Sequence, residues 1–474
     1  MEEDKISLRH YFSSFGTAVK NGNIFTRLSL IIMGLGHWAN GQIVKGCIVT
    51  AVEAIFIWVI SLIGGTYWPK LNTLGTVQRE EKFDPLTMTK TVNHFDNSLL
   101  ILLFSIVGIV IAFFFAIYYI YNIKQIYEVQ KRKEVGLHVN TFKEDCREMI
   151  NGKFFITLLG LPTIGVILVN VIPIVFMTCI GFTNYDIDHQ PPTYLFTWVG
   201  LRNFKTLFTS SVSDSFGYVF IRILIWTLIW AVVATFTTFF GGIFLAKFIN
   251  DKRTKLPAMW RTFFVITIAI PQFVTLLLVG KMFGNNGIVN GICSQIGLTG
   301  FLQDIGLVSK GLGYIPFLSK PGWAHVMIIL INIWVGVPFQ MLSATGLLMN
   351  IPTDQLEAAK IDGASERQIF WKITMPYIMF VMGPSLVTTI IANINNFNVI
   401  YLLTTDFTTT NMKFANSHGK EVDLLITWLF NLTNNYSNFK MASVIGIITF
   451  VICVALTLLS FSKFVQGDRE EEFQ

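Results

Sequence analysis

Long apolar runs separated by short polar connections dominate the chain. About eight of these runs are long enough to cross a lipid bilayer as a helix, which takes roughly 18 to 20 mainly apolar residues. Helices are expected because an open sheet edge would leave backbone groups without hydrogen-bond partners in lipid. The predicted spans lie near Cys47–Tyr67, Leu99–Ile123, Phe154–Phe182, Phe220–Ile249, Thr262–Phe283, His325–Leu348, Tyr377–Leu403 and Ala442–Phe464. The expected fold class is therefore an all-α polytopic membrane protein with about eight transmembrane helices.

A shorter apolar run precedes these spans. It covers Ile24–Trp38, contains Arg27 and His37, and is too short to cross a bilayer. We therefore predict that it forms an interfacial or re-entrant helix rather than a span.

Several prolines fall inside the predicted spans, at Pro162, Pro173, Pro271, Pro338 and Pro384. Each removes a backbone hydrogen bond and permits a kink. Such kinks suit helices that open alternately on the two sides of a membrane, but they also occur in static bundles.

Composition and charge agree with a membrane protein. The 474 residues are 53% hydrophobic and 14% charged, whereas soluble domains carry about 25% charged residues. With the N-terminus inside, the inner connections hold about 21 Lys and Arg and the outer ones about 12, which is the positive-inside bias. The net charge of +6 is therefore interpreted as membrane topology and not as a nucleic-acid surface. We expect a plasma membrane protein with both termini in the cytoplasm.

One polar stretch between two spans stands out. Glu357–Pro376 reads EAAKIDGASERQIFWKITMP and lies on the predicted inner side. A first short helix is predicted to start after a cap at Thr353 or Asp354. Gly363 should end it, because glycine enters a left-handed turn without steric penalty. A second helix over Ala364–Ile373 is predicted to end or kink at the closing proline. Two short helices at a small-residue elbow would let a partner backbone approach closely.

The spacing of this stretch resembles the E-A-A signature of permease subunits of binding-protein-dependent ABC importers. Met375 stands where the signature has Leu, and the other signature positions match. The resemblance implies that loop 352–376 docks into an ATPase subunit, whereas the simpler interpretation is an ordinary cytoplasmic loop. The residues implied to couple to the ATPase are Glu357, Ala358, Ala359, Asp362, Gly363, Ala364, Ile373 and Pro376.

The resemblance extends over most of the chain. Trp334–Phe339 is similar to the W-x-G-x-P-F segment of the family, and Gly287–Asn290 is similar to its outer G-x-x-N loop. It implies a six-helix permease core at 154–466, an N-terminal region at 1–153 with an interfacial helix and two transmembrane helices, and an acidic tail at 467–474. Two extra spans before a six-helix core are similar to the larger permease subunit of maltose and maltodextrin importers.

Such a subunit would act with a second permease, two ATPase subunits and an extracytoplasmic sugar-binding protein. ATP and Mg would then be held by the ATPase partners. This chain contains no G-x-x-x-x-G-K-[ST] nucleotide loop, no catalytic triad pattern and no metal-ligand cluster. We therefore expect a transport subunit with no cofactor of its own and no enzymatic activity.

Amide and aromatic side chains cluster in the sixth and seventh spans. Amides can donate to and accept from sugar hydroxyls, and aromatic rings cover the apolar faces of sugar rings. Polar groups inside a membrane are costly and tend to be functional, although these amides could also form hydrogen bonds between helices. The predicted substrate-binding residues are Asn332, Gly336, Phe339, Asn393, Asn396 and Phe397. The absence of charge among them fits a neutral cargo.

The sequence departs from the maltose permease pattern at several places. Phe339 stands where that pattern has a Tyr, and Ala392 replaces a second aromatic residue. Trp226-Thr227 stands where the family has Asn-Thr, and the usual Gly-Gly-Pro is missing from 404–407. The cargo is therefore left open among maltodextrin, galacto-oligosaccharide and raffinose-type sugars.

Two other functions compete with that of an importer subunit. A secondary transporter or channel would work without ATP, but ion-coupled carriers usually need charged relays inside the membrane. Here only Glu53 and Arg222 are available, and Arg222 lies near an end of its span; Glu53 is expected to make a buried contact or to reach the membrane surface. A membrane scaffold or receptor without cargo is the third possibility.

Overall fold

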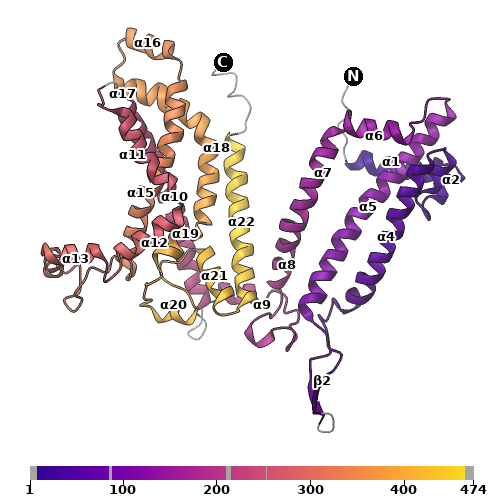
Figure 1. Ribbon diagram of the computed structural model, residues 1–474, viewed down its shortest axis with the longest axis horizontal. Coiled ribbons are helices and arrows are strands. Elements are labelled where there is room, and N and C mark those ends of the chain that lie inside the picture. Colours follow the sequence, from indigo (N-terminus) through magenta and orange to yellow (C-terminus); the bar gives the residue numbers. More distant parts are fainter. Residues whose placement is uncertain (1–7, 85–87, 210–214, 252, 465–474) are drawn as a thin grey trace. The chain divides into compact units, whose positions relative to one another are not determined.

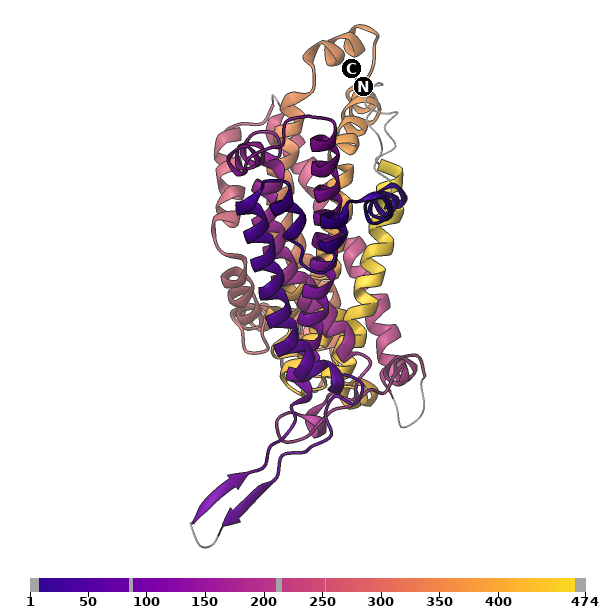
Figure 2. The same cartoon turned by 90° about the vertical axis from the view of Figure 1, so that its right-hand side faces the viewer.

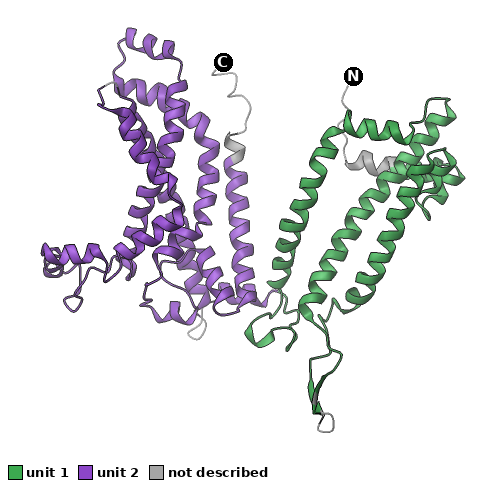
Figure 3. Ribbon diagram, viewed as in Figure 1, with its two compact units in different colours: residues 1–200 green, residues 201–474 purple. Residues whose placement is uncertain are grey.

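The computed structural model describes residues 8–84, 88–209, 215–251 and 253–464. The packing divides the chain into two compact units, residues 1–200 and residues 201–474 (Figure 3). The acidic tail predicted at 467–474 lies outside the described residues.

Unit 1 consists mainly of helices, which are labelled in Figure 1. Its short elements are α1 (Leu8–Asn21), α2 (Ile24–Leu28), α3 (Leu35–Ala39), η1 (Trp68–Lys70), α6 (Phe142–Ile150) and η3 (Ile187–His189). Its long helices are α4 (Ile43–Tyr67), α5 (Ser98–Glu134) and α7 (Phe154–Val166), the last of which continues through η2 (Ile167–Val171) into α8 (Ile172–Ile180). The two strands β1 (Glu81–Asp84) and β2 (Thr89–Val92) form an antiparallel hairpin with Glu81 opposite Val92.

Polar contacts connect the short helices of unit 1 to α5. The buried His37 ring contacts the side chains of Gln42, at 2.8 Å, and Asn122, at 3.0 Å. Gln130 accepts from the Thr26 hydroxyl at 2.7 Å. The run at Ile24–Trp38 therefore forms α2, a turn and most of α3, and it is too short to span a membrane, as predicted.

The hairpin β1–β2 and helix α6 lie at opposite ends of unit 1, as Figure 2 shows together with Figure 1. The hairpin belongs to the connection between α4 and α5, and the sequence did not predict strands there. α6 begins at a capping box, in which the Glu144 carboxylate accepts from the Thr141 backbone N–H at 2.7 Å. Hydrogen bonds from Thr141 lower the pKa of Glu144 to about 2.

Unit 2 holds the remaining helices. Its long helices are α10 (Phe216–Asn250), α15 (Pro321–Asn350), α18 (Met375–Ile394) and α22 (Phe439–Phe464). Its shorter elements are α9 (Arg202–Phe208), α11 (Pro257–Ala269), α12 (Gln272–Met282), α13 (Ile288–Gln295), α14 (Leu298–Asp304), α16 (Thr353–Ile361), α17 (Glu366–Ile369), η4 (Phe370–Thr374), α19 (Phe397–Leu403), α20 (Met412–Asn416) and α21 (Leu425–Asn434). α16 lies at one end of this unit, and α20 and α21 lie at the other (Figure 1).

Helices α10 and α15 pack closely at the centre of unit 2. A Cβ atom on Gly242 would lie 2.4 Å from Cβ of Gln340 and 2.8 Å from the backbone nitrogen of Met341. Glycine therefore allows the two backbones to approach, as small residues commonly do between membrane helices. Toward the N-terminal ends of α10 and α15 the core is apolar and includes Trp230 and Ile328. Toward their C-terminal ends it includes Ile249 and Ala344.

Within the described residues, seven helices are long and apolar enough to cross a membrane, and a bent pair raises the number to as many as eight. The predicted fold class is therefore confirmed. The fifth span, expected over Thr262–Phe283, is the bent pair: α11 and α12 meet at 92° at Ile270-Pro271. The kink expected at Pro271 is thus a complete break, because proline has no N–H and pushes the preceding residue into an extended conformation.

Two other prolines are accommodated without a break. Pro173 and Pro376 each follow a single π-helical turn, η2 and η4. In both turns a backbone N–H reaches back five residues, from Ile172 to Ile167 and from Met375 to Phe370. Widening the turn relieves the clash that a proline ring makes with the carbonyl four residues earlier. Pro376 therefore does not end the second helix of the polar stretch, which continues into α18.

The division by packing differs from the division drawn from the sequence. Helices α7 and α8 belong to unit 1, where α8 packs on α5. The sequence assigns the same span to a permease core at 154–466. That core is defined by function rather than by packing, and its boundary remains a prediction.

Candidate functional site

A cavity of about 380 Å³ lies in unit 2, where two spans are broken. α10 and α15 contribute Thr238, Asn332, Val335, Gly336, Phe339 and Gln340, and the two broken spans contribute Thr267, Ile268, Ile270, Pro271, Gln272, Thr275, Thr389, Asn393 and Asn396. Five of the six predicted substrate-binding residues are among them. None of these lining side chains is ionisable.

The first break separates α18 from α19 at Asn395-Asn396. Asn396 caps α19, since its side-chain oxygen accepts from the Val399 N–H at 3.3 Å. The carbonyl of Asn393, at the break, accepts from the Asn396 backbone N–H at 3.2 Å and from the indole N–H of Trp230 at 3.1 Å. Backbone groups inside a membrane need such partners or a polar cavity, so the break is held open by contacts on both of its sides.

The second break, between α11 and α12, reaches the same cavity through Pro271 and Gln272. Two interrupted helices therefore meet at one polar space. Membrane transporters commonly bind their substrates at discontinuous helices of this kind, because non-helical backbone at membrane depth is tolerated where it lines a cavity.

Asn332 and Asn393 differ in their hydrogen bonds. The Asn393 amide donates to the Thr235 hydroxyl at 2.9 Å, which is a contact between α18 and α10. The Asn332 side chain is only 7% exposed, and no residue in the described part of the chain forms a hydrogen bond with it. Its amide atoms are not among the fully buried polar atoms that lack a partner in the described chain, so they reach the cavity, where a ligand could form hydrogen bonds with them.

Gly336, Phe339 and Phe397 have different surroundings. A Cβ atom on Gly336 would lie 2.7 Å from the Thr238 methyl group, so this glycine is needed for the packing of α15 on α10. Phe339 lines the cavity and is 59% exposed in the single chain. Phe397 does not line the cavity; its ring stacks on Tyr401 with centroids 4.7 Å apart.

Some lining residues were not predicted from the sequence. Gln340 directly follows Phe339, and Thr389 lies one helical turn before Asn393, so helical spacing could have identified both. Thr238 and Gln272 come from other helices and belong to no recognisable motif.

The polar stretch forms two helices, α16 and α17, at the end of unit 2 opposite α20 and α21 (Figure 1). Gly363 has a φ of +81°, as expected of the elbow. The Ala364 N–H donates to the Ala359 carbonyl at 2.9 Å, and the Gly363 N–H donates to the Lys360 carbonyl at 3.1 Å. This pair of bonds is a Schellman motif, which requires a left-handed residue at the Gly363 position.

The details of both helix starts differ from the prediction. Pro352 occupies the N-cap position of α16, and neither Thr353 nor Asp354 caps the helix, so that prediction is wrong. The second helix begins at Glu366 instead of Ala364, because Ser365 and Gln368 form a capping box. Ile361, at the end of α16, is 86% exposed. We define the segment Thr353–Ile369 as the handle.

The other predicted coupling residues divide between the handle and the helix that follows it. Glu357, Ala358, Ala359, Asp362, Gly363 and Ala364 belong to the handle. Ile373 lies in η4 and Pro376 in the first turn of α18, so both belong to the continuous helix that connects the handle to the cavity.

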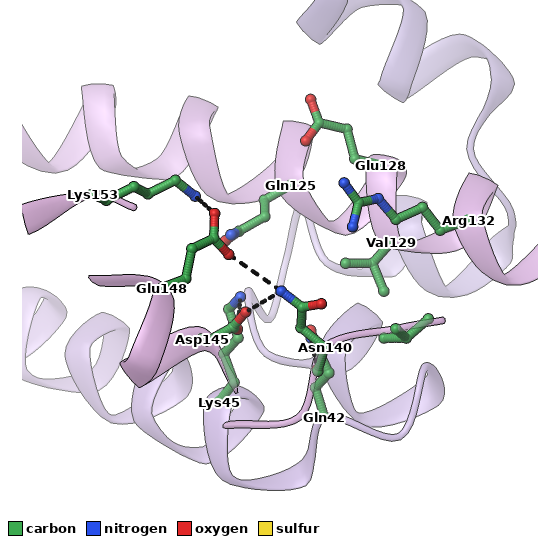
Figure 4. Close-up of a pocket in the computed structure, with 11 residues that line it drawn as sticks. Gln42, Lys45, Gln125, Glu128, Val129, Arg132, Asn140, Asp145, Glu148 and Lys153 are labelled. Carbon is green, nitrogen blue, oxygen red and sulfur yellow. Dashed lines mark hydrogen bonds and ion pairs between the residues drawn. The ribbon is translucent and has the colours of Figure 1, made fainter. Parts of the chain in front are cut away.

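A second cavity, of about 90 Å³, lies in unit 1 and is charged (Figure 4). Lys45 pairs with Asp145 at 2.7 Å, and Lys153 pairs with Glu148 at 2.8 Å. The Asn140 amide donates to both carboxylates. The charges of these two lysines and two carboxylates are therefore paired within the cluster, which is typical of a structural role.

Glu53, the acidic residue deep in a predicted span, has a structural partner. Its carboxylate accepts from the Met33 backbone N–H at 2.8 Å and so ties α4 to the turn before α3. In the described part of the chain, no group of three or more His, Cys, Asp or Glu side chains could hold a metal ion.

Comparisons with known proteins place the chain among transport subunits. The family described as "Binding-protein-dependent transport system inner membrane component" matches residues 238–466. The chain is 32% identical over 444 residues to the maltodextrin transport system permease protein MdxF of Bacillus subtilis, which covers 93% of this chain and 95% of that protein. It is 31% identical over 438 residues to the galactooligosaccharides transport system permease protein GanP of the same organism, covering 91% and 96%.

A solved structure shares the fold. It is the crystal structure of a bacterial ABC transporter involved in the import of the acidic polysaccharide alginate. The match has a TM-score of 0.51 and 20% identity, and it covers 68% of this chain and 99% of that chain.

The spans, the polar cavity and the relatives define a membrane-embedded transport subunit, not an enzyme. The chain belongs to the family of binding-protein-dependent transport system inner membrane components, the permease subunits of ABC importers. In such importers, ATP is hydrolysed by separate ATPase subunits.

Proposed function

We propose that this chain forms part of the path through which an ATP-driven importer passes a neutral oligosaccharide of the maltodextrin type. The names of the relatives motivate the choice of cargo, since they transport maltodextrin or galactooligosaccharides. Maltodextrin is chosen because MdxF and MalC proteins, which share 30% identity or more over most of the chain, carry that name.

The observation that carries the cargo proposal is the unpartnered amide of Asn332 in a cavity without ionisable side chains. Sugar hydroxyls both donate and accept, so one hydroxyl can satisfy either end of the amide. Gln340 and Asn396 add further amides, and Phe339 offers an exposed ring for the apolar face of a sugar. An anionic cargo would find no cation among the lining residues.

We also propose that an ATPase subunit binds this chain at the handle. Most of the handle is exposed, its first helix ends in a fully formed Schellman motif, and its second helix leads through η4 into α18 without a helix end. α18 ends at the cavity, at Asn393–Asn396. A displacement of the handle would therefore be carried along one continuous helix to the break that lines the cargo site.

The remaining partners follow from the family. We propose a second permease subunit, two ATPase subunits that bind ATP and Mg, and an extracytoplasmic sugar-binding protein. The handle, and both termini, would face the cytoplasm. This orientation is supported by the excess of Lys and Arg in the connections on that side.

Substitutions at Gly363 test the role of the handle, because they affect only the backbone conformation at this position. No atom lies within 4 Å of the place where a Cβ would be, so a side chain fits but the φ of +81° does not suit it. Asn tolerates positive φ, whereas forcing a β-branched residue there costs on the order of 1–2 kcal/mol. We expect Gly363→Val to lower ATP-dependent uptake about ten-fold, with Gly363→Asn close to wild type. If ATP-dependent uptake were equal in both variants and in the wild type, the proposed role of the handle in binding an ATPase subunit would be contradicted.

A further inference from the structure

The arm formed by α13 and α14 carries an apolar surface that no described residue of unit 2 covers. α13 extends sideways from unit 2, across the direction of α10, α15 and α22, at the end that also holds α20 and α21 (Figure 1). We define the uncovered surface, named here the arm stripe, by its large side chains, each at least half exposed: Ile288, Ile292, Ile296, Phe301 and Ile305.

The arm itself is firmly built. Asn290 is buried, and its amide donates to the carbonyls of Gly284, at 3.0 Å, and Ile315, at 3.1 Å. Its side-chain oxygen accepts from the Ile315 N–H at 2.8 Å. A small core of Cys293, Val308 and other apolar residues fills the inside of the arm. The exposed stripe is therefore not an unfolded segment, because a separate face of α13 already makes the core.

Helical geometry gives α13 three faces. At 100° per residue, Ile288, Ile292 and Ile296 fall within about 80° of one another. Asn290 and Cys293, which are buried, occupy the neighbouring sector. Ser294 is exposed and lies about 160° from Ile292, on the opposite side. One face therefore meets the protein, one is polar, and one is apolar without a partner.

We propose that the arm stripe inserts into the outer surface of the lipid bilayer, so that α13 lies in the plane of the membrane. The preceding segment α12, which is half of the bent span, also exposes apolar side chains, among them Phe273 and Leu278. Residues 288–303 contain no charged side chain, whereas a soluble partner would normally be met by a polar rim. Amphipathic helices with such a stripe bury their apolar side chains at the boundary of headgroups and acyl chains.

The flanks of the arm fit the same position. Trp323 donates its indole N–H to the Leu307 carbonyl at 3.3 Å, and Lys310 and Lys320 lie nearby in the sequence. Tryptophan and lysine are typical of the boundary between lipid and water. Because the stripe itself has no cation, the proposal requires a lipid surface but no particular headgroup. The membrane contact is independent of the cargo and of the role of the handle, and only its assignment to the outer surface rests on the proposed orientation.

Fluorescence quenching tests the proposal in the full-length chain in lipid nanodiscs. The five native cysteines are replaced by alanine, and a bimane label is attached to Ile292→Cys, to Ile296→Cys as a second reporter, or to Ser294→Cys as the matched control. Doxyl-labelled phosphatidylcholine should quench the two stripe positions about three-fold more than the control, and aqueous iodide should show the reverse order.

Two results would overturn the proposal. Quenching of the stripe by iodide at the level of the control would place it in water. Protection of the stripe from both quenchers would mean that a protein, such as a second subunit or a second copy, covers it. The same experiment with phosphatidylglycerol nanodiscs should give the same lipid quenching, and a requirement for the anionic lipid would contradict the uncharged contact.

Discussion

At the scale of single residues, the same side chain has different roles in this site. Asn393 binds Thr235 across two helices, as the structural interpretation of these amides expects, whereas Asn332 has no partner among the described residues. The sequence predicts both as substrate-binding amides from one cluster of polar and aromatic residues, so sequence alone gives them one role. Separating them requires knowing which neighbouring helix brings a hydroxyl within reach, and that depends on packing.

The two amides should therefore respond differently to substitution. Asn393→Ala removes the bond to Thr235 and should lower the free energy of unfolding by about 1 kcal/mol. Asn332→Ala removes a group without a partner, so the melting temperature should hold while the apparent KM for cargo rises. Thermal melting and uptake of labelled maltodextrin measure the two effects. Asn395→Ala, outside the cavity, is the control, and a larger stability loss in Asn332→Ala than in Asn393→Ala would refute the distinction.

Asp423 gives the chain a pH-dependent stability. Burial raises the pKa of its carboxyl from 3.8 to about 6, although the Lys420 N–H and the Thr427 hydroxyl donate to it. In the unfolded chain the carboxyl ionises near its ordinary pKa, while the folded chain keeps the proton. Raising the pH from 4 to 6 therefore removes stability through this group, and lowering it from 7.5 to 5 restores it.

Acidification to below the ordinary pKa regains about 3 kcal/mol in full, and about half of this is regained between pH 7.5 and pH 5. Asp423→Asn should abolish this share of the pH dependence, because Asn can accept from Lys420 and donate to the Thr427 oxygen. Melting temperatures of the purified protein at pH 7.5 and pH 5 provide the measurement. Asp406→Asn, at an exposed aspartate, should behave as wild type. If wild type and Asp423→Asn changed equally with pH, the buried carboxyl would not be the cause.

At the scale of helices, the apolar runs and their lengths could be predicted because burial in lipid requires them. The breaks could not. At the end of α18, Trp230 from α10 donates to the Asn393 carbonyl, which also accepts from the Asn396 N–H, so the break depends on a neighbouring helix. The proline at 271 predicted a kink, but the angle of 92° depends on neighbours that receive the polar backbone. The sequence therefore identified cavity residues that lie near a motif, but it did not identify Thr238 and Gln272, which lie near none.

The contact between α10 and α15 should be sensitive to a single methyl group. Gly242→Ala places a Cβ against the backbone of Gln340 and Met341, which cannot move without moving the helix. We expect a loss of about 3 kcal/mol, at the upper end of over-packed sites. Gly346→Ala is the matched control on α15, since no atom lies within 4 Å of its Cβ position. Thermal unfolding in detergent compares them, and equal melting temperatures would contradict the close helix contact.

At the scale of the whole molecule, the chain has a polar cavity and a handle but no nucleotide-binding motif in its sequence. The number of spans, the handle and five of the cavity residues could be predicted from runs and motifs. The grouping of α7 and α8 with unit 1 and the apolar arm stripe could not, because both depend on which helices pack together. We therefore assign transport to an assembly in which a separate ATPase subunit moves this chain.

Reconstitution tests that claim most directly. Proteoliposomes containing the chain with its second permease and ATPase subunits, supplied with binding protein outside and ATP inside, should accumulate labelled maltodextrin. Proteoliposomes containing the chain alone should not, with or without ATP. Accumulation or leakage of the sugar through the chain alone would contradict the account, because the path would then work without a motor.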